Sequence, residues 1–272
     1  MSRARINWLW SLACLALFCQ AAQGVEFVDF HVDSKLYLGN EDKPISEITT
    51  IFRSGFVYDF ITDPNKKNDP ETTIFDSLRG RFVVIDPQRR VWTQVSTEAL
   101  KTFTAKVKLD AAAAPQAILN FMSEPKFKEE TDGEGMAFKS HWMEYRLKTV
   151  PGKSTRAVEQ YAEFSQWSSQ MNVRLTPRSL PPFPRMKISQ ILSERGLLPT
   201  DVHMTLDSGQ AGIPKYAIRA THRFQWTLLE PDRQRIDQAG SQMASFRELT
   251  VDEYINRGTP ETASKQDPAK RK

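Results

Sequence analysis

The first half of the chain alternates between apolar and polar residues in short runs. Between Val28 and Leu38, apolar residues recur at every second position with one exception, and Asp29, His31 and Asp33 lie on the opposite side. Because successive side chains of a strand point to opposite faces, this period of two predicts a long, half-buried strand. We interpret the row that contains Asp29, His31 and Asp33 as its solvent-exposed outer face.

Short strands continue the pattern. They are predicted at 45–53, 56–62, 71–75, 81–85 and 91–95. Ser54-Gly55 and Asp86-Pro87 have the composition of tight turns, so an antiparallel meander is the simplest arrangement. Residues 82–85 (Phe-Val-Val-Ile) are apolar at every position, which predicts a strand covered on both faces.

The second half alternates helical and strand-like segments. The clearest helix covers 154–175, with Ser154 at its start and a broad apolar stripe. Gly196 is placed to end a shorter helix, and Pro231 to open another. Further helices are predicted from Ser96 or Thr97 and at 115–122, and further strands at 127–130, 136–150, 202–206, 216–229 and 246–249.

Together these elements predict a β-rich α+β fold. We expect a curved antiparallel sheet, or an incomplete β-barrel, with helices packed on its concave face. One domain is expected to span 25–257, because the strands after the proline-rich connector 176–184 can complete the same sheet. Residues 258–272 are polar and predicted to be a disordered basic tail.

Residues 1–24 have the pattern of a cleaved export signal. Arg3 and Arg5 precede an apolar run at 8–18 that is too short to span a bilayer, and Gly24 ends a small-residue cleavage site. A retained N-terminal anchor is the alternative. No transmembrane segment is predicted after signal removal, so we expect an exported protein, either periplasmic or secreted.

Charge and cysteine content exclude several classes of function. Arg3 and Arg5 supply two of the four net positive charges and the tail 258–272 supplies the other two, so the body is formally neutral. A nucleic-acid-binding protein normally carries a clear basic excess, and this body has none. We therefore expect the protein not to bind nucleic acid. Both cysteines, Cys14 and Cys19, lie in the signal, so the mature chain has no disulfide, Cys–metal site or Cys nucleophile.

No pattern of histidines or acids predicts a metal site. Asp29, His31 and Asp33 could hold a metal ion or form an acid–base pair, but any amphipathic strand produces such a row. The remaining histidines lack a carboxylate at ligand spacing: His141, His203 and His222. We expect no metal and no cofactor.

No catalytic residue is predicted either. Asp207-Ser208-Gly209 lacks the preceding glycine of a nucleophile elbow. The acidic cluster of Glu129, Glu130, Asp132 and Glu134 has no aromatic sugar platform beside it, so we read it as a soluble hairpin turn. The chain is therefore expected not to be an enzyme.

One stretch resembles a known family. Residues 73–95, TIFDSLRGRFVVIDPQRRVWTQV, carry a strand, a turn, an apolar strand, Asp86-Pro87 and a further strand in the order of the periplasmic lipoprotein carriers of the Lol type (LolA and LolB). The resemblance covers roughly 26–110, while the helix at 154–175 and the proline-rich connector have no counterpart. It implies an unclosed barrel whose concave side is plugged by helices and takes up acyl chains. The whole chain is also similar to secreted bacterial proteins of this length.

The resemblance implies a non-enzymatic envelope protein that binds an apolar ligand, a lipid or a lipoprotein acyl chain, between sheet and helices. The helix at 154–175 could act as a lid. Aromatic residues on predicted strands are the candidates for lining such a cavity: Phe56, Phe82, Trp92, Trp142 and Trp226. For the tryptophans, core packing is the default role, and lining the cavity is the functional alternative.

Two other functions stay open. The first is a structural or protein-interaction module of the envelope, with a protein partner that the sequence does not identify. In that case the protein's own side chains would fill the cavity. The second is a hydrolase that uses scattered carboxylates such as Asp33 or Glu130.

Overall fold

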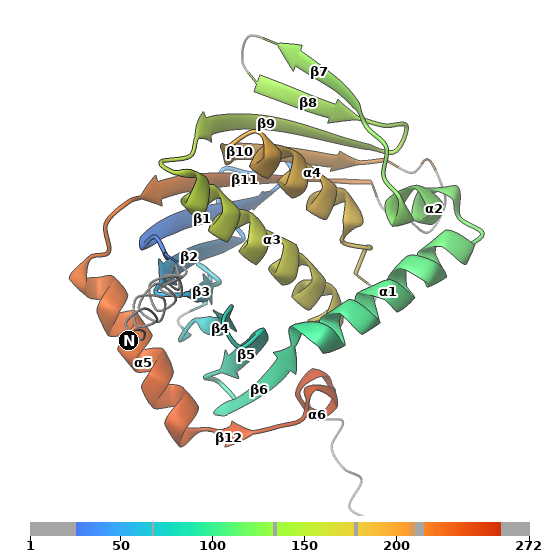
Figure 1. The fold of residues 1–272 in the computed structure, drawn as a ribbon. Helices are drawn as coiled ribbons and strands as arrows, with labels where there is room; N and C mark the ends of the chain where they lie inside the picture. The colour runs from blue at the N-terminus through green and yellow to red at the C-terminus, as the bar shows by residue number, and fades with distance from the viewer. Residues whose placement is uncertain are drawn as a thin grey trace, which may run out of the picture.

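The structure is a computed structural model that describes residues 26–66, 68–132, 135–176, 179–207, 209 and 215–256. The predicted signal (1–24) and tail (258–272) lie outside these residues. The described strands form one open, mixed, twelve-stranded sheet that curves around α3 and α4 (Figure 1). The expected β-rich α+β fold with an unclosed sheet is thereby confirmed.

The elements follow one another along the chain with these bounds. The strands are β1 (Phe30–Leu38), β2 (Ser46–Arg53), β3 (Phe56–Thr62), β4 (Glu71–Asp76), β5 (Arg81–Asp86), β6 (Val91–Ser96), β7 (Lys128–Asp132), β8 (Gly135–Lys139), β9 (Met143–Pro151), β10 (Leu197–Leu206), β11 (Tyr216–Gln225) and β12 (Arg247–Glu248). The helices are α1 (Thr97–Ala113), α2 (Ala117–Ser123), α3 (Thr155–Leu175), α4 (Phe183–Glu194), α5 (Glu230–Ser245) and α6 (Val251–Ile255).

Strands β1 to β6 form the predicted antiparallel meander. Each strand pairs with its neighbour in sequence, and β12 adds a short parallel edge beside β6. The turn between β2 and β3 places Ser54 at φ 50° and Gly55 at φ 85°. A two-residue hairpin turn requires this left-handed backbone, which explains the glycine.

The later strands enter the sheet on the other side of β1. The order continues β1-β11-β10-β9-β8-β7, all antiparallel, so the strands after the proline-rich connector do complete the same sheet. The single strand predicted at 136–150 is wrong, because a tight turn divides it into β8 and β9. In this turn the Ser140 amide donates to the Met143 carbonyl at 2.8 Å, and the Ser140 hydroxyl accepts from the amides of Trp142 and Met143.

The inner face of the meander packs against α3. The Ser154 hydroxyl caps this helix by accepting from the Ala157 amide, as its sequence predicts. Phe164 packs edge-on against Phe52, which in turn stacks on Phe30 with ring centroids 4.1 Å apart. These side chains belong to one buried cluster. To act as the expected lid, α3 would have to leave this core.

The outer face of the meander is covered by α5. Ile236 and Ala239 of α5 pack against Ile51, Val83 and Ile85. Residues 82–85 are therefore buried from both sides, as their uniform apolarity predicts. The sheet is sandwiched wherever α3 and α5 face each other across it.

The cover by α5 corrects the interpretation of the row Asp29, His31 and Asp33. His31 is 4% exposed, and its Nδ1 lies 2.9 Å from Oδ2 of Asp232, which is itself buried near the start of α5. The start of β1 is therefore buried on both faces. The expected solvent-exposed face begins only with the second half of the strand, where Lys35 is exposed.

Candidate functional site

The sheet forks between β10 and β11. These strands pair from Leu206–Tyr216 as far as Asp201–Thr221, and there the ladder ends. Beyond that point, residues 197–199 of β10 continue to pair only with β9, and residues 222–225 of β11 only with β1. We call this opening the β10–β11 fork.

A proline lies at the point where the strands separate. The pairing of β10 with β9 has a register irregularity between Pro199 and Asp201. Proline lacks a backbone N–H and cannot donate to a ladder on either side, so it is normally confined to edges and bulges. Here it coincides with the end of the β10–β11 ladder.

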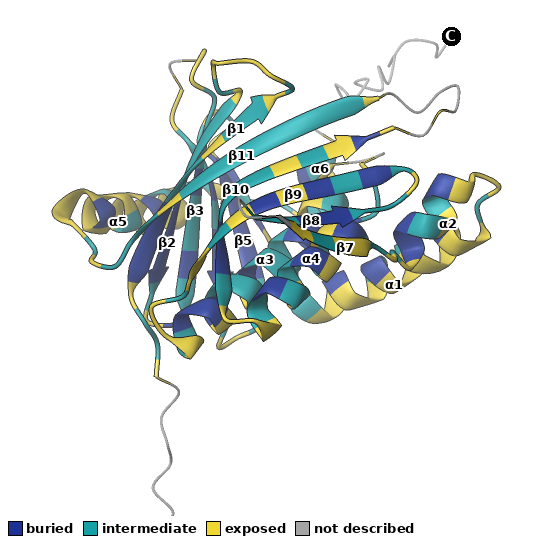
Figure 2. Ribbon diagram, turned by 90° about the horizontal axis from the view of Figure 1, so that it is seen from above, coloured by how far each residue is buried: buried dark blue, intermediate teal, exposed yellow. Residues whose placement is uncertain are grey.

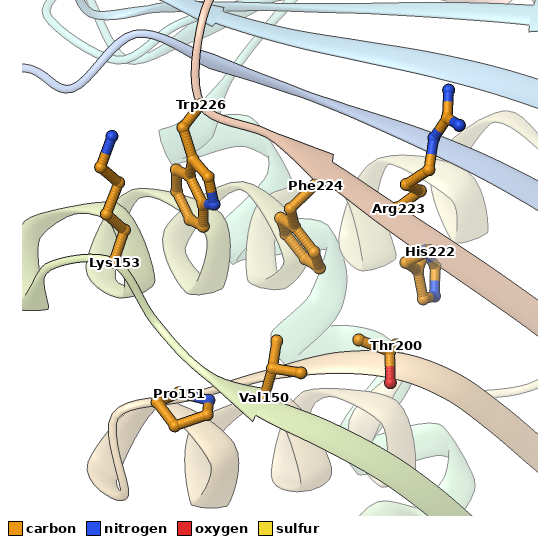
Figure 3. Close-up of a pocket in the computed structure, with 8 residues that line it drawn as sticks. All are labelled: Val150, Pro151, Lys153, Thr200, His222, Arg223, Phe224 and Trp226. Carbon is orange, nitrogen blue, oxygen red and sulfur yellow. The ribbon is translucent and has the colours of Figure 1, made fainter.

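A pocket of about 590 Å³ lies in the fork (Figure 3). From the β11 side, His222, Phe224 and Trp226 point into it, while Arg223 points to the opposite side of the strand. Val150 of β9 and Thr200 of β10 lie across from them. This volume falls in the range of about 300–1,000 Å³ that is usual for small-molecule sites.

The aromatic wall of the pocket continues into the inner core. Phe224 stacks on Trp226 with ring centroids 5.9 Å apart, and Trp226 lies 5.3 Å from Phe30. Tyr161 of α3 meets the Phe224 ring edge-on at 5.4 Å. The wall is therefore held from β1 and α3, and the pocket opens beside the main core.

His222 provides a neutral polar group in this wall. Its Nδ1 lies 2.8 Å from the Ser34 hydroxyl on β1. Burial lowers the pKa of His222 to about 4, and the positive charge of Arg185 adds to the effect. The imidazole is therefore uncharged at neutral pH.

Two cations are among the lining residues, but only Lys153 has its charge at the pocket margin. The Lys153 ammonium lies 5.9 Å from the centroid of the Trp226 ring. The guanidinium of Arg223 lies 3.4 Å from Asp33 on the outer side of the sheet. No acidic residue is among the eight described residues that line the pocket.

Two ionisable groups on the inner face have raised pKa values. Burial raises the pKa of the Asp59 carboxyl to about 6, although it accepts a hydrogen bond from the Thr50 hydroxyl at 2.6 Å. Burial likewise raises the pKa of the Tyr161 hydroxyl to about 12. In both groups burial is the main cause of the shift, because it disfavours the charged form.

The five aromatic residues expected to line a cavity lie in different parts of the molecule. Trp226 lines the β10–β11 pocket. Phe82 is fully buried in the inner core, and Trp92 and Phe56 pack in the cluster under α5. Trp142 belongs to a separate cluster near α2, 5.2 Å from Phe121.

Phe56 also borders a second crevice, together with Phe27 and Glu163. Its volume is about 10 Å³. That is room for at most about one water molecule, so it is not a ligand site.

Sequence reasoning selected only Trp226 of the eight described residues that line the pocket, and it missed the other seven, among them Phe224, Val150, Thr200 and Lys153. Phe224 carried a usable signal, since it lies two positions before Trp226 in a predicted strand and so shares its face. Val150 and Thr200 carried none, because the fork depends on where a ladder between distant strands ends.

The scattered acids form surface ion pairs. Glu129 binds Arg195 through two hydrogen bonds, which lower the pKa of its carboxyl. Glu130 pairs with Lys139 at 2.6 Å and with Lys128 at 3.1 Å, and both lower its pKa. Glu134 lies outside the described residues, as does Ser208 of the Asp-Ser-Gly segment.

The remaining histidines stand apart from one another. His203 lies 2.9 Å from Asp201 on an exposed part of β10, and the His141 ring packs beside Trp142. Within the described part of the chain, no three His, Cys, Asp or Glu side chains converge where they could hold a metal ion. None of the described helices is both long and apolar enough to cross a membrane.

Comparison with known proteins gives limited information. No protein-family model matches the sequence, and a search of curated proteins finds no significant match. Among solved structures, the crystal structure of a LolA superfamily protein from Nitrosomonas europaea is matched over 76% of this chain and 88% of that chain. The two are 5% identical in sequence, with a TM-score of 0.26. So low a score supports no argument, and the fold rests on the strand pairing described above.

Proposed function

We propose that the protein is a binding protein without catalytic activity, and that it takes up the hydrocarbon chain of a lipid or an acylated protein in the β10–β11 pocket. The observation that carries the proposal is the fork itself. It opens a pocket of about 590 Å³ whose wall includes Phe224, Trp226 and Val150. The site differs from the one expected from sequence, because it lies where two strands part.

The driving force would be burial of hydrocarbon. Each methylene group removed from water contributes about 0.8 kcal/mol, so six methylenes placed against Phe224 and Trp226 would contribute about 5 kcal/mol before the entropic cost of association. His222 is neutral at pH 7, so its side chain adds no charge to the wall. Export, as the pattern of residues 1–24 predicts, would place such a protein where envelope lipids and lipoproteins are found.

A charge placed in the pocket tests the proposal. Val150 lines the pocket and is 38% exposed, so Val150→Glu should be tolerated by the fold while it puts a carboxylate against the hydrocarbon. We expect the affinity for an uncharged fluorescent dodecyl probe to fall at least about tenfold, because the new carboxylate must lose part of its hydration when hydrocarbon packs against it. Fluorescence titration of the purified protein measures this.

The matched control is Leu109→Glu. Leu109 is on α1, 71% exposed and not among the residues that line the pocket. It should leave probe binding unchanged. If the unmodified protein takes up no apolar probe, the binding function is wrong, and the alternative of a structural or protein-interaction module gains support.

A further inference from the structure

The charges around the β10–β11 pocket are unbalanced, and this restricts the ligand. Resting on the proposed function, we propose that the ligand is a single-chain amphiphile with an anionic head group, a carboxylate or a phosphate, and that the head group lies at Lys153. The described residues that line the pocket include two cations, Lys153 and Arg223, and no carboxylate, but only Lys153 has its charge on the pocket side of the sheet. A neutral lipid would form no ion pair with this positive charge.

Lys153 is the better placed of the two cations. Arg223 points to the opposite side of β11 and lies 3.4 Å from Asp33, so its charge is already shared. Lys153 is exposed and lies over the Trp226 ring, and within the described residues no carboxylate comes within ion-pair distance of it. Its ammonium is therefore available to a ligand.

The backbone at Lys153 adds to the positive potential. Lys153 directly precedes Ser154, the N-cap of the 21-residue helix α3. The N-terminal end of a helix carries a partial positive charge that acidic residues usually offset, but the first turn of α3 contains none. A cation at this position is unfavourable for the protein alone, and a bound anion would relieve the repulsion.

The distribution of charged and uncharged polar groups along the pocket also determines the orientation of the bound amphiphile. Lys153 lies beside Trp226 at one end of the pocket, and His222 and Thr200 lie at the other (Figure 3). Since the groups at the second end are polar but uncharged, the head group belongs at the Lys153 end. The hydrocarbon chain of the ligand then runs along Phe224 toward His222.

Three probes with the same chain test the head group. Dodecanoate, dodecyl phosphate and dodecanol are titrated into the purified protein at pH 8 by isothermal calorimetry. We expect the anions to bind about fivefold more tightly than dodecanol, the effect of one exposed ion pair. The preference should shrink as salt is added, because salt screens exposed charges. The ratio of the two anions shows whether a carboxylate or a phosphate fits better.

Lys153→Gln should remove the preference for the anions and leave dodecanol binding unchanged. Lys148→Gln is the control, since Lys148 is an exposed lysine of β9 that does not line the pocket. Equal binding of all three probes by the unmodified protein would overturn the head-group inference alone. A preference that survives in Lys153→Gln would overturn the role of Lys153, and no binding of any probe would overturn the proposed function.

Discussion

The two halves of the sheet differ in how completely they are covered. In the meander β1–β6, α3 packs on the inner face and α5 on the outer face, and most residues of β4 and β5 are buried, with Phe82, Val84 and Ile85 fully so. Along β10 and β11, most residues remain half-buried or exposed (Figure 2). The pocket lies in this second half, where the β10–β11 ladder ends.

The contrast separates the role of stability from the role of binding. A strand that is covered on both faces can present no side chain to a ligand, and the meander therefore acts as the support. By contrast, a strand with an unpaired stretch and a partly exposed face can present side chains to a ligand. Three changes test how far this division holds, and they run from the largest expected effect to the smallest.

The largest effect is expected from Phe82→Ala in the meander. Phe82 is fully buried and stacks on Phe75 with ring centroids 4.7 Å apart, so its loss leaves a cavity in the inner core. The free energy of unfolding should fall by about 3–5 kcal/mol. Val150→Ala in the forked half should cost less than about 1 kcal/mol, because Val150 is 38% exposed. Urea unfolding measures both, and similar losses would contradict the division.

An intermediate effect is expected from Asp232→Ala, which loosens the cover of the outer face. The Asp232 carboxylate accepts from the Leu229 amide at 2.8 Å and lies 2.9 Å from Nδ1 of His31, so its removal leaves this buried ring nitrogen without its hydrogen-bond partner. Unfolding free energy should fall by about 2 kcal/mol. Asp237→Ala, at an exposed position of α5, should change it by less than about 0.5 kcal/mol. Equal effects in thermal unfolding would show that α5 is not fastened through Asp232.

The smallest effect is expected from Asp59→Asn on the inner face. Burial raises the pKa of Asp59 to about 6 from the ordinary 3.8, so the unfolded chain ionises first as pH rises. The raised pKa of Asp59 therefore costs no stability below about pH 4, and between about pH 4 and pH 6 it lowers the free energy of unfolding progressively. Asparagine removes this penalty. The variant should match the unmodified protein at pH 3.5 and exceed it at pH 7 by about 1 kcal/mol, since the group is half-buried.

His222 titrates in the same range with the opposite sign. Because its pKa is lowered, His222 costs no stability above pH 6.5. As pH falls toward 4, stability declines, because His222 is then protonated in the unfolded chain while the buried imidazole of the folded protein is still neutral. The Asp59→Asn measurement must therefore be read as a difference between two proteins at each pH. A difference that does not grow between pH 4 and 6 would show that Asp59 titrates normally.

Local patterns predicted most of the fold. The alternation in 28–38, the Ser54-Gly55 turn and the N-cap at Ser154 all depend on interactions within a few residues, and the structure has each of them. The position of α5 was not predictable in this way. Its own pattern indicates a helix, but nothing local shows that it covers His31, which is about 200 residues away in sequence.

The site was less predictable for the same reason. Aromatic content selected Trp226, which lines the pocket directly after β11, but it also selected Phe82, Trp92, Phe56 and Trp142, which do not line the pocket and are divided among three clusters. What distinguishes Trp226 is that the strand before it loses its partner on one side. That property depends on where the pairing of β10 with β11 ends, and no short stretch of the sequence can show it.

The sheet order also bears on how the chain is assembled. Asp33 of β1 lies beside Arg223 of β11, a partner 190 residues further along. Until that partner is available, β1 has a bare hydrogen-bonding edge in the middle of the future sheet, and such edges invite pairing between chains. Contacts over so long a separation form slowly. Joining β11 to β1 is therefore a late event, and any agent that shields that edge beforehand would raise the yield of native molecules.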